Sequence, residues 1–178
     1  MYKIRIHGRG GQGAKKAAKM IGMAAFKMGK QVQDFALYGA ERRGAPVMSF
    51  VRIGDSPILE RGYVDDPDAV LVLDRTLLDL VNVADGLDAK GVLIVNSEHE
   101  ITIDTPATVK HVDATSIALE TIGKPIFNTT MLGALAKLTD IISIDALDWA
   151  IEEELSHYPK ELVRANKDAV RKCYEVAK

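Results

Sequence analysis

The sequence has little cysteine and no long apolar run. Cys173 is the only cysteine among 178 residues, so an internal disulfide is excluded, and no set of thiolates exists for a zinc ion or an iron–sulfur cluster. No segment approaches the ~20 apolar residues of a membrane span, and the opening MYKIRIHG is too short in apolar residues for a signal peptide. These absences predict a cytoplasmic chain with no membrane association.

Net charge is also small. The 23 basic and 25 acidic residues give a formal charge of −2, which predicts no attraction to nucleic acid or to an anionic membrane. The four histidines are scattered, with no second histidine or cysteine three or four positions away, which argues against a metal site; they are His7, His99, His111 and His157. No serine lies in a G-x-S-x-G context, so acyl-enzyme chemistry has no support. The sequence therefore predicts no catalytic residue on this chain.

Apolar residues, by contrast, are plentiful. They make up 47% of the sequence, enough to bury a core in one domain of residues 1–178. Helix and strand signals alternate along the chain. This alternation predicts an α/β fold, a three-layer α/β/α arrangement around a Rossmann-like, mostly parallel sheet.

The apolar patterns also place the elements. Strands are expected at 2–7, 31–35, 47–53, 69–73, 91–95, 101–103 and 109–112. The pair Gly54-Asp55 is a turn signal, so residues 47–53 and 57–59 are predicted to form an antiparallel hairpin. Helices are expected at 12–28, 75–81, 116–122, 129–138, 145–155 and from Pro159 to about 176.

A glycine-rich turn follows the first predicted strand. It reads HGRGGQG, with Gly8, Gly10 and Gly13 at the spacing of a dinucleotide-binding turn. Glycine lets the chain turn sharply, and the following helix N-terminus offers free N–H groups to an anion. Asp34, 21 positions after Gly13, could bind a ribose. A stand-alone dinucleotide-binding protein is therefore one hypothesis, and a binding module for another phosphate ligand is a second.

Three features argue against a dinucleotide. Arg9 and Gln12 are long side chains at a point where a pyrophosphate would need clearance. The segment YGAERRGAP, residues 38–46, carries Arg42 and Arg43, which ribose binding does not explain. The rest of the chain offers no group for hydride transfer.

Four segments in order resemble the gamma subunit of the 2-oxoacid:ferredoxin oxidoreductases, and the pyruvate enzyme (pyruvate synthase) most of all. They are GRGGQG at 8–13, YGAERRGAPVMSFVRI at 38–53, DAVLVLD at 68–74 with the following Thr76-Leu77-Leu78, and FNTTMLGALAKLT at 127–139. The gamma subunits of branched-chain (2-oxoisovalerate) enzymes look much alike and are the alternative within the family.

The resemblance implies a function for the whole complex. Such an enzyme converts pyruvate, coenzyme A (CoA) and oxidised ferredoxin to acetyl-CoA, carbon dioxide and reduced ferredoxin. Thiamine diphosphate, Mg²⁺ and iron–sulfur clusters are expected on partner alpha, beta and delta subunits of a heterotetramer, and no cofactor is expected on this chain. Alone, the chain is expected to be inactive, and its self-association is left open.

The resemblance also gives the glycine turn a use. The residues concerned are Gly8, Arg9, Gly10, Gly11, Gln12, Gly13, Arg42 and Arg43. They are predicted to face a sister subunit near the CoA channel, because arginine is enriched in interfaces. Direct contact with CoA phosphates is the alternative, since a helix N-terminus and an arginine fork both suit phosphate.

Other charged residues are interpreted as solvated. Lys15, Lys16, Lys19 and Lys27 are expected to face solvent from the first helix, as are the glutamates at 152–154. The acidic cluster of Asp65, Asp66 and Asp68 is interpreted as a solvated turn, with a docking spot for a basic partner as the alternative.

Overall fold

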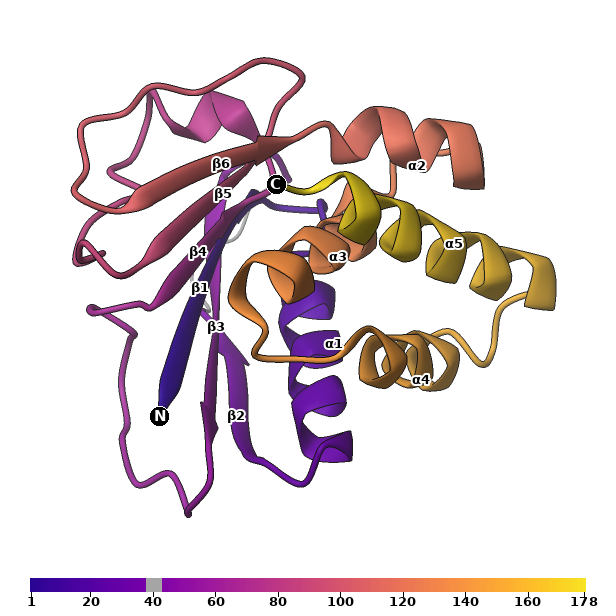
Figure 1. The fold of residues 1–178 in the computed structure, drawn as a ribbon, viewed down its shortest axis with the longest axis horizontal. Helices are drawn as coiled ribbons and strands as arrows, with labels where there is room; N and C mark the ends of the chain where they lie inside the picture. Colours follow the sequence, from indigo (N-terminus) through magenta and orange to yellow (C-terminus); the bar gives the residue numbers. More distant parts are fainter. Residues whose placement is uncertain (38–42) are drawn as a thin grey trace.

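The computed structural model describes residues 1–37 and 43–178, so the prediction for Arg42 lies outside the described residues. Its centre is a six-stranded sheet in the order β2-β3-β1-β4-β5-β6 (Figure 1). The strands are β1 (Tyr2–Arg9), β2 (Gln31–Ala36), β3 (Pro46–Gly54), β4 (Ala69–Val72), β5 (Val92–Asn96) and β6 (Thr108–Val112).

The sheet is mostly parallel with an antiparallel part. β1, β4, β5 and β6 pair in parallel, whereas β3 pairs antiparallel with both β1 and β2. The predicted antiparallel element therefore exists, but the predicted hairpin is wrong. Residues 55–68 form no strand, and β3 pairs instead with the preceding strand β2 and with β1 at the start of the chain. Pro57 lacks the N–H that a paired strand needs, and the chain after Gly54 instead crosses the sheet face.

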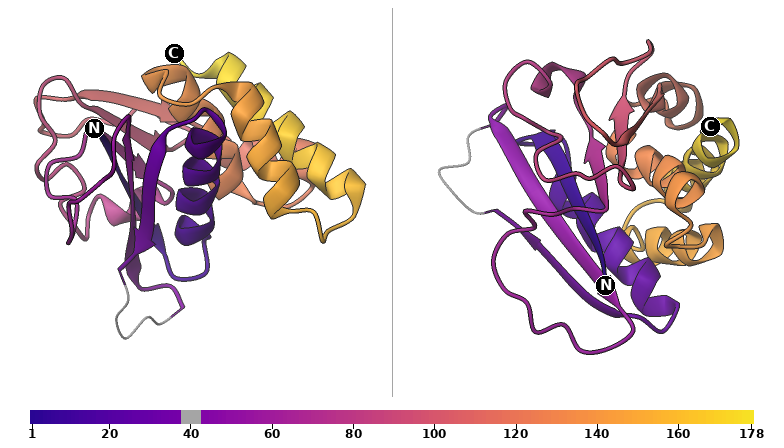
Figure 2. Two further views of the ribbon diagram at one scale, coloured as in Figure 1. Left: turned by 90° about the horizontal axis from the view of Figure 1, so that it is seen from below. Right: turned by 60° about the vertical axis from the view of Figure 1, so that its left-hand side comes forward.

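One face of the sheet carries the α-helices that the structure describes. They are α1 (Ala14–Lys27), α2 (Ala114–Ile122), α3 (Phe127–Thr139), α4 (Ile144–Glu154) and α5 (Lys160–Val176). Figures 1 and 2 show all of them on the same side of the sheet. Their small and apolar residues join Ile4, Ile6, Leu71 and Ile94 of the strands in one continuous core. Because these strand side chains alternate along the chain, a single face takes them all.

On the opposite face of the sheet, a 3₁₀ turn and irregular segments take the place of α-helices. The predicted helix at 75–81 is reduced to a 3₁₀ turn, η1 (Arg75–Leu77), which Asp74 caps by accepting a hydrogen bond from the Thr76 amide at 3.0 Å. Irregular segments complete this layer, and the strand predicted at 101–103 is not formed. Ile101 and Ile103 pack instead against a smaller apolar cluster around Val70 and Val72. The α/β class is confirmed, with irregular structure as the layer on this face.

Two buried arginines fasten that irregular layer. Residues 55–67, named the strap here, lie on the side of the sheet opposite the α-helices (Figures 1 and 2). Arg52 on β3 is 1% exposed and donates to the carbonyls of Gly62 and Tyr63 at 2.8 and 3.0 Å. Arg5 on β1 donates to the carbonyls of Val64, at 3.2 Å, and of two residues in the 83–85 loop. Backbone groups of the strap thus find donors that no strand pairing provides.

Candidate functional site

The glycine turn lies where β1 ends and α1 begins. Gly11 and Gly13 have positive φ angles of 94° and 83°. A Cβ on Gly13 would lie only 2.6 Å from Nδ2 of Asn128, so no other residue fits without a shift. Gly13 is also the N-cap of α1, and no side chain caps this end of the helix. The first N–H groups of α1 and their partial positive charge are therefore available to an anion.

The side chains of Arg9 and Gln12 point toward Asp74 and Thr76, which follow β4, and do not extend across the glycine turn. Gln12 accepts a hydrogen bond from the Arg9 amide and donates one to Asp74, both at 2.7 Å. The Arg9 guanidinium lies 3.2 Å from the same Asp74 oxygen and donates to the Thr76 hydroxyl at 2.6 Å. Burial alone would raise the pKa of Asp74, but hydrogen bonds from Thr76 and Gln12 together with the Arg9 charge hold it below its usual value. These two predicted site residues therefore set the shape of the turn.

The segment around Arg43 meets the turn. The amide of Gly10 donates to the carbonyl of Ala45 at 2.8 Å, and the amide of Gly44 donates to the carbonyl of Gly10 at 3.0 Å. A Cβ on Gly11 would lie 3.8 Å from Cγ of Arg43, so the stem of this exposed arginine passes over the turn. The structure thus brings together the glycine turn and Arg43, which are more than 30 positions apart.

A basic pocket of about 530 Å³ opens beside the turn. Its wall includes Arg9 and the lysines at 15, 16 and 19, of which Lys15 and Lys19 are exposed, as the sequence predicts. Glu154 at the end of α4 also lines it and pairs with Lys19 at 2.6 Å, with its side chain only 13% exposed. The interpretation of Glu154 as solvated is therefore wrong, because α4 packs against α1 and brings this glutamate to the lysines.

A second groove of about 580 Å³ flanks the turn on the side of α3. Gln12 and Lys16 line it together with Lys124, Tyr158 and the first turn of α3. No side chain caps the N-terminus of α3. Two uncapped helix N-termini and several lysines therefore surround the glycine turn. Such an arrangement suits phosphate or carboxylate groups, and its described residues include no histidine or unpaired carboxylate that could act as a general base.

Asp34 does not reach this site. β3 lies between β1 and β2, and Asp34 is paired with Val51 on that intervening strand. Its carboxylate faces Gly22 of α1, nine residues beyond Gly13 and therefore about 13 Å along the helix. Partial burial raises the pKa of Asp34, while the charges of Lys19 and Lys15 act in the opposite direction. The geometry thus gives the predicted ribose contact no support.

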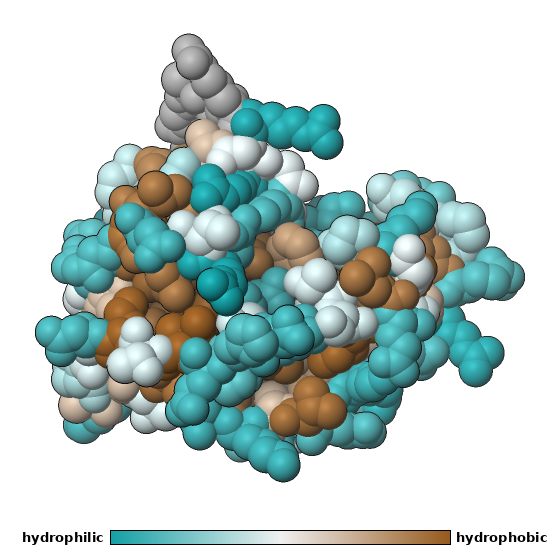
Figure 3. Space-filling model, turned by 90° about the horizontal axis from the view of Figure 1, so that it is seen from above, coloured by the Kyte–Doolittle hydropathy of each residue, from teal (hydrophilic) through white to brown (hydrophobic). Residues whose placement is uncertain are grey.

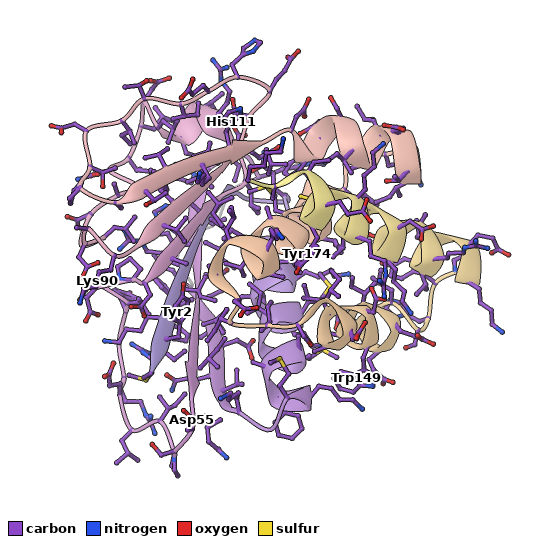
Figure 4. All side chains as sticks on the ribbon, in the orientation of Figure 1. Tyr2, Asp55, Lys90, His111, Trp149 and Tyr174 are labelled. Carbon is purple, nitrogen blue, oxygen red and sulfur yellow. The ribbon has the colours of Figure 1, made fainter. Side chains whose placement is uncertain are left out.

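The described residues carry neither a metal-binding cluster nor a membrane-spanning helix. Among them, no group of three or more His, Cys, Asp or Glu side chains could hold a metal ion. His111, for example, lies on β6, the edge strand that β4 and β5 separate from β1 (Figure 4). Cys173 is fully buried on α5, and burial raises the pKa of its thiol to about 12. In the same part of the chain, no helix is long and apolar enough to cross a membrane.

Comparison with known proteins places the chain in a family. The family model described as pyruvate ferredoxin/flavodoxin oxidoreductase matches residues 3–176. The pyruvate synthase subunit PorC of Methanothermobacter marburgensis is 48% identical over 178 residues, covering 100% of this chain and 98% of the relative. The common gamma subunit of the pyruvate/ketoisovalerate oxidoreductases of Pyrococcus furiosus is 46% identical, covering 98% and 96%.

A solved structure agrees. The crystal structure of the pyruvate oxidoreductase subunit PORC from Thermotoga maritima matches with a TM-score of 0.86 and 42% identity, covering 98% of this chain and 95% of that one. Sequence and fold thus agree along the whole length, and the resemblance predicted from the four segments is confirmed. The chain belongs to the pyruvate ferredoxin/flavodoxin oxidoreductase family.

Proposed function

We propose that this chain is the gamma subunit of a pyruvate:ferredoxin oxidoreductase in the cytoplasm. The observation that carries the proposal is the full-length likeness, at 48% identity, to a pyruvate synthase subunit PorC. The complex would convert pyruvate, CoA and oxidised ferredoxin to acetyl-CoA, carbon dioxide and reduced ferredoxin. Alpha, beta and delta partners would carry thiamine diphosphate, Mg²⁺ and the iron–sulfur clusters.

The site supports a non-catalytic role for the chain itself. Among its described residues, the charged groups are lysines, arginines and the carboxylates of Asp74 and Glu154, which are already engaged by neighbours. A carboxylate held in such contacts is a poor proton acceptor. The glycine turn and Arg43 would therefore serve to seat a sister subunit, as the sequence predicts, while carbon and electron chemistry proceed on the partners.

One observation supports a role for this chain with a second 2-oxoacid as well as pyruvate. The Pyrococcus furiosus relative is named as a subunit common to pyruvate and ketoisovalerate oxidoreductases. A gamma subunit shared in this way does not select the 2-oxoacid. We propose accordingly that exchange of this chain between two such complexes would leave their substrate preference unchanged.

CoA is the phosphate-bearing substrate that fits the basic pocket. Two uncapped helix N-termini, with Lys16 between the pocket and the groove, would bind its phosphates where the sister subunit closes over the turn. Dinucleotide binding has less support, because Asp34 lies away from the turn.

The test is assembly followed by kinetics. The tagged chain is expected to be inactive with pyruvate and a viologen dye, and to gain activity and bound iron when co-expressed with its partner subunits. In the complex, Lys16→Met should raise the KM for CoA by about tenfold, the loss of one charged phosphate contact, with kcat little changed. Lys27→Met is the control, since Lys27 lies over the Trp149 ring away from the turn. Activity of the lone chain would contradict the proposal.

A further inference from the structure

A separate pocket lies on the sheet face that the strap covers. It measures about 260 Å³, and its wall is mostly apolar. Leu37, Met48, Phe50, Val64 and Val81 line it, and the exposed ring of Tyr63 stands at its rim. Figure 3 shows apolar surface on the same side of the molecule, with polar groups around it. The volume is below that of ordinary small-molecule sites and suits one apolar side chain.

Two polar side chains, Arg5 and His7, also line this pocket from β1. The Arg5 Nε–H donates to Nε2 of His7 at 3.1 Å, so the proton of the neutral imidazole must be on Nδ1. Burial, with the nearby Arg5 charge, lowers the pKa of His7 to about 4, which keeps the ring neutral at physiological pH.

His7 is only 4% exposed, but its Nδ1 is not one of the buried, unpartnered side-chain atoms of the described residues, so this N–H is open to the pocket. No described residue accepts it, and an occupant that displaces water from the pocket must supply an acceptor to keep it paired. The pocket therefore presents one unused hydrogen-bond donor inside an apolar wall, which points to an occupant that brings an acceptor.

The charges around the pocket restrict that occupant further. The exposed side chains of Asp65 and Asp85 line it, opposed by the single guanidinium of Arg5, which backbone carbonyls already engage. The local balance is negative, so a free carboxylate or phosphate is disfavoured. A neutral acceptor with a cation beside it is favoured, and a peptide carbonyl next to a lysine or arginine has this chemistry.

We infer that this pocket anchors an apolar side chain of a sister subunit, from a segment with a lysine or arginine close by in sequence. The backbone carbonyl of that segment accepts the His7 Nδ1–H, and its cation meets Asp65 and Asp85. The inference rests on the proposed function, because it needs a partner subunit. Leu37 and Pro46 line the pocket and flank the segment that contains Arg43, so one partner surface can cover both.

A photo-crosslinker tests the contact in the assembled complex. Benzoylphenylalanine in place of Tyr63 is expected to join a partner peptide at an apolar residue with lysine or arginine nearby. The same substitution at Leu59, an 82% exposed strap residue that does not line the pocket, is the control. Absence of a crosslink from position 63 in a complex that assembles would overturn the inference, as would a crosslink to an acidic peptide.

Charge reversal gives a second test. Asp65→Lys should weaken binding of the sister subunit by about tenfold, and Val81→Trp, which fills the pocket, by at least as much, as expected for a buried anchor. Thermal unfolding of the lone Asp65→Lys chain should match the wild type. Asp104→Lys makes the same charge change at an exposed residue outside the pocket and should have no effect.

The outcomes separate the two proposals. Wild-type affinity in both pocket variants would overturn the inference and leave the proposed function standing. A chain that never assembles with thiamine- and cluster-bearing subunits would overturn both. A small molecule found in the pocket by native mass spectrometry, and retained in the complex, would overturn the inference alone.

Discussion

The two faces of the sheet are covered in different ways. On the helix face, strand residues such as Ile4, Ile6 and Leu71 meet helices and form one apolar core. On the strap face the apolar cluster is smaller, and Arg5 and Arg52 lie buried beside it. Helices satisfy their own backbone groups, so they can be packed against an apolar surface. Irregular segments leave carbonyls unpaired, and buried arginines supply the donors.

The two faces also differ in what they leave for binding. On the helix face, the uncapped N-termini of α1 and α3 lie beside the glycine turn. The strap face keeps a pocket with an unused donor on His7. Each face therefore leaves a place for binding, and the two faces differ in how the rest is packed, so substitutions on each face should fail in different ways.

The largest effect is expected from Gly133→Ala on the helix face. A Cβ at Gly133 in α3 would lie 2.1 Å from the carbonyl oxygen of Val170 and 2.8 Å from the amide nitrogen of Tyr174, both backbone atoms of α5. Backbone atoms cannot move to another rotamer as a side chain can, so α3 and α5 must separate. This should lower the free energy of unfolding by about 3 kcal/mol. Denaturant unfolding of the lone chain measures this loss.

The matched control is Gly22→Ala in α1. There the new Cβ would meet side-chain atoms of Asp34 and Val32 at 3.1 and 3.2 Å, and these can adjust. The gain in helix propensity should offset much of the crowding, leaving a change of less than about 1 kcal/mol. An equal loss in free energy of unfolding in both variants would show that the close approach of α3 and α5 is not what excludes a side chain at position 133.

A smaller but distinct effect is expected from Arg52→Met on the strap face. The change keeps the volume and removes the donors to the Gly62 and Tyr63 carbonyls, at a cost of about 2 kcal/mol. The strap should also be cut faster by trypsin, at Arg61. The control Arg61→Lys keeps a trypsin site, and Arg61 itself bonds only nearby carbonyls at an exposed position, so stability should be unchanged. Unaltered cleavage in Arg52→Met would mean that the strap is held by other contacts.

The difference between the faces explains what could be predicted from the sequence. Apolar periodicity marks helix-face residues directly, and the predicted helices at 12–28, 145–155 and 159–176 lie within two residues of α1, α4 and α5 at each end. The hairpin predicted after β3 is wrong because Gly54-Asp55 is only a local turn signal, whereas β3 pairs with the preceding strand β2 and with β1 at the start of the chain. No local pattern marks Arg52 as the residue that holds the strap.

The candidate site was predicted in part for the same reason. The glycine turn has a local sequence signature, and the family resemblance joined it to the segment around Arg43. The pocket lysines and Glu154 were missed, since their grouping depends on how α4 packs against α1. Asp74 and Thr76 were recognised only as part of a family segment. The only local signal for their hydrogen bonds to Arg9 and Gln12 is that Asp74 and Thr76 are polar residues directly after a buried strand.

A smaller loss of stability is expected from substitution of Asp74, which holds Arg9 and Gln12 of the glycine turn. Its folded pKa is lowered, so the stability it supplies is present above the unfolded value near 3.8 and is lost as pH falls through the folded pKa. Asp74→Asn should cost about 1 kcal/mol at pH 7, because the Arg9 contact loses its charge. Urea titrations at several pH values should show that the difference in free energy of unfolding between the wild type and Asp74→Asn disappears below about pH 4. Asp88→Asn, a carboxylate that bonds only nearby amides, is the control. A gap that persisted into acid would contradict the role of the charge.

The smallest effect concerns His7 beneath the strap. Its folded pKa of about 4 is below the unfolded value of 6.5, so between these values the unfolded chain binds more protons and stability falls as pH falls. From pH 7 to pH 6 the loss from this group should be about 0.7 kcal/mol. Nitrogen NMR of the lone chain should show a neutral ring with the proton on Nδ1 throughout this range, with the exposed His99 as the reference signal. A His7 ring that gained its second proton near pH 6 would show that the strap admits water to this face, and the contrast between the two faces would be lost.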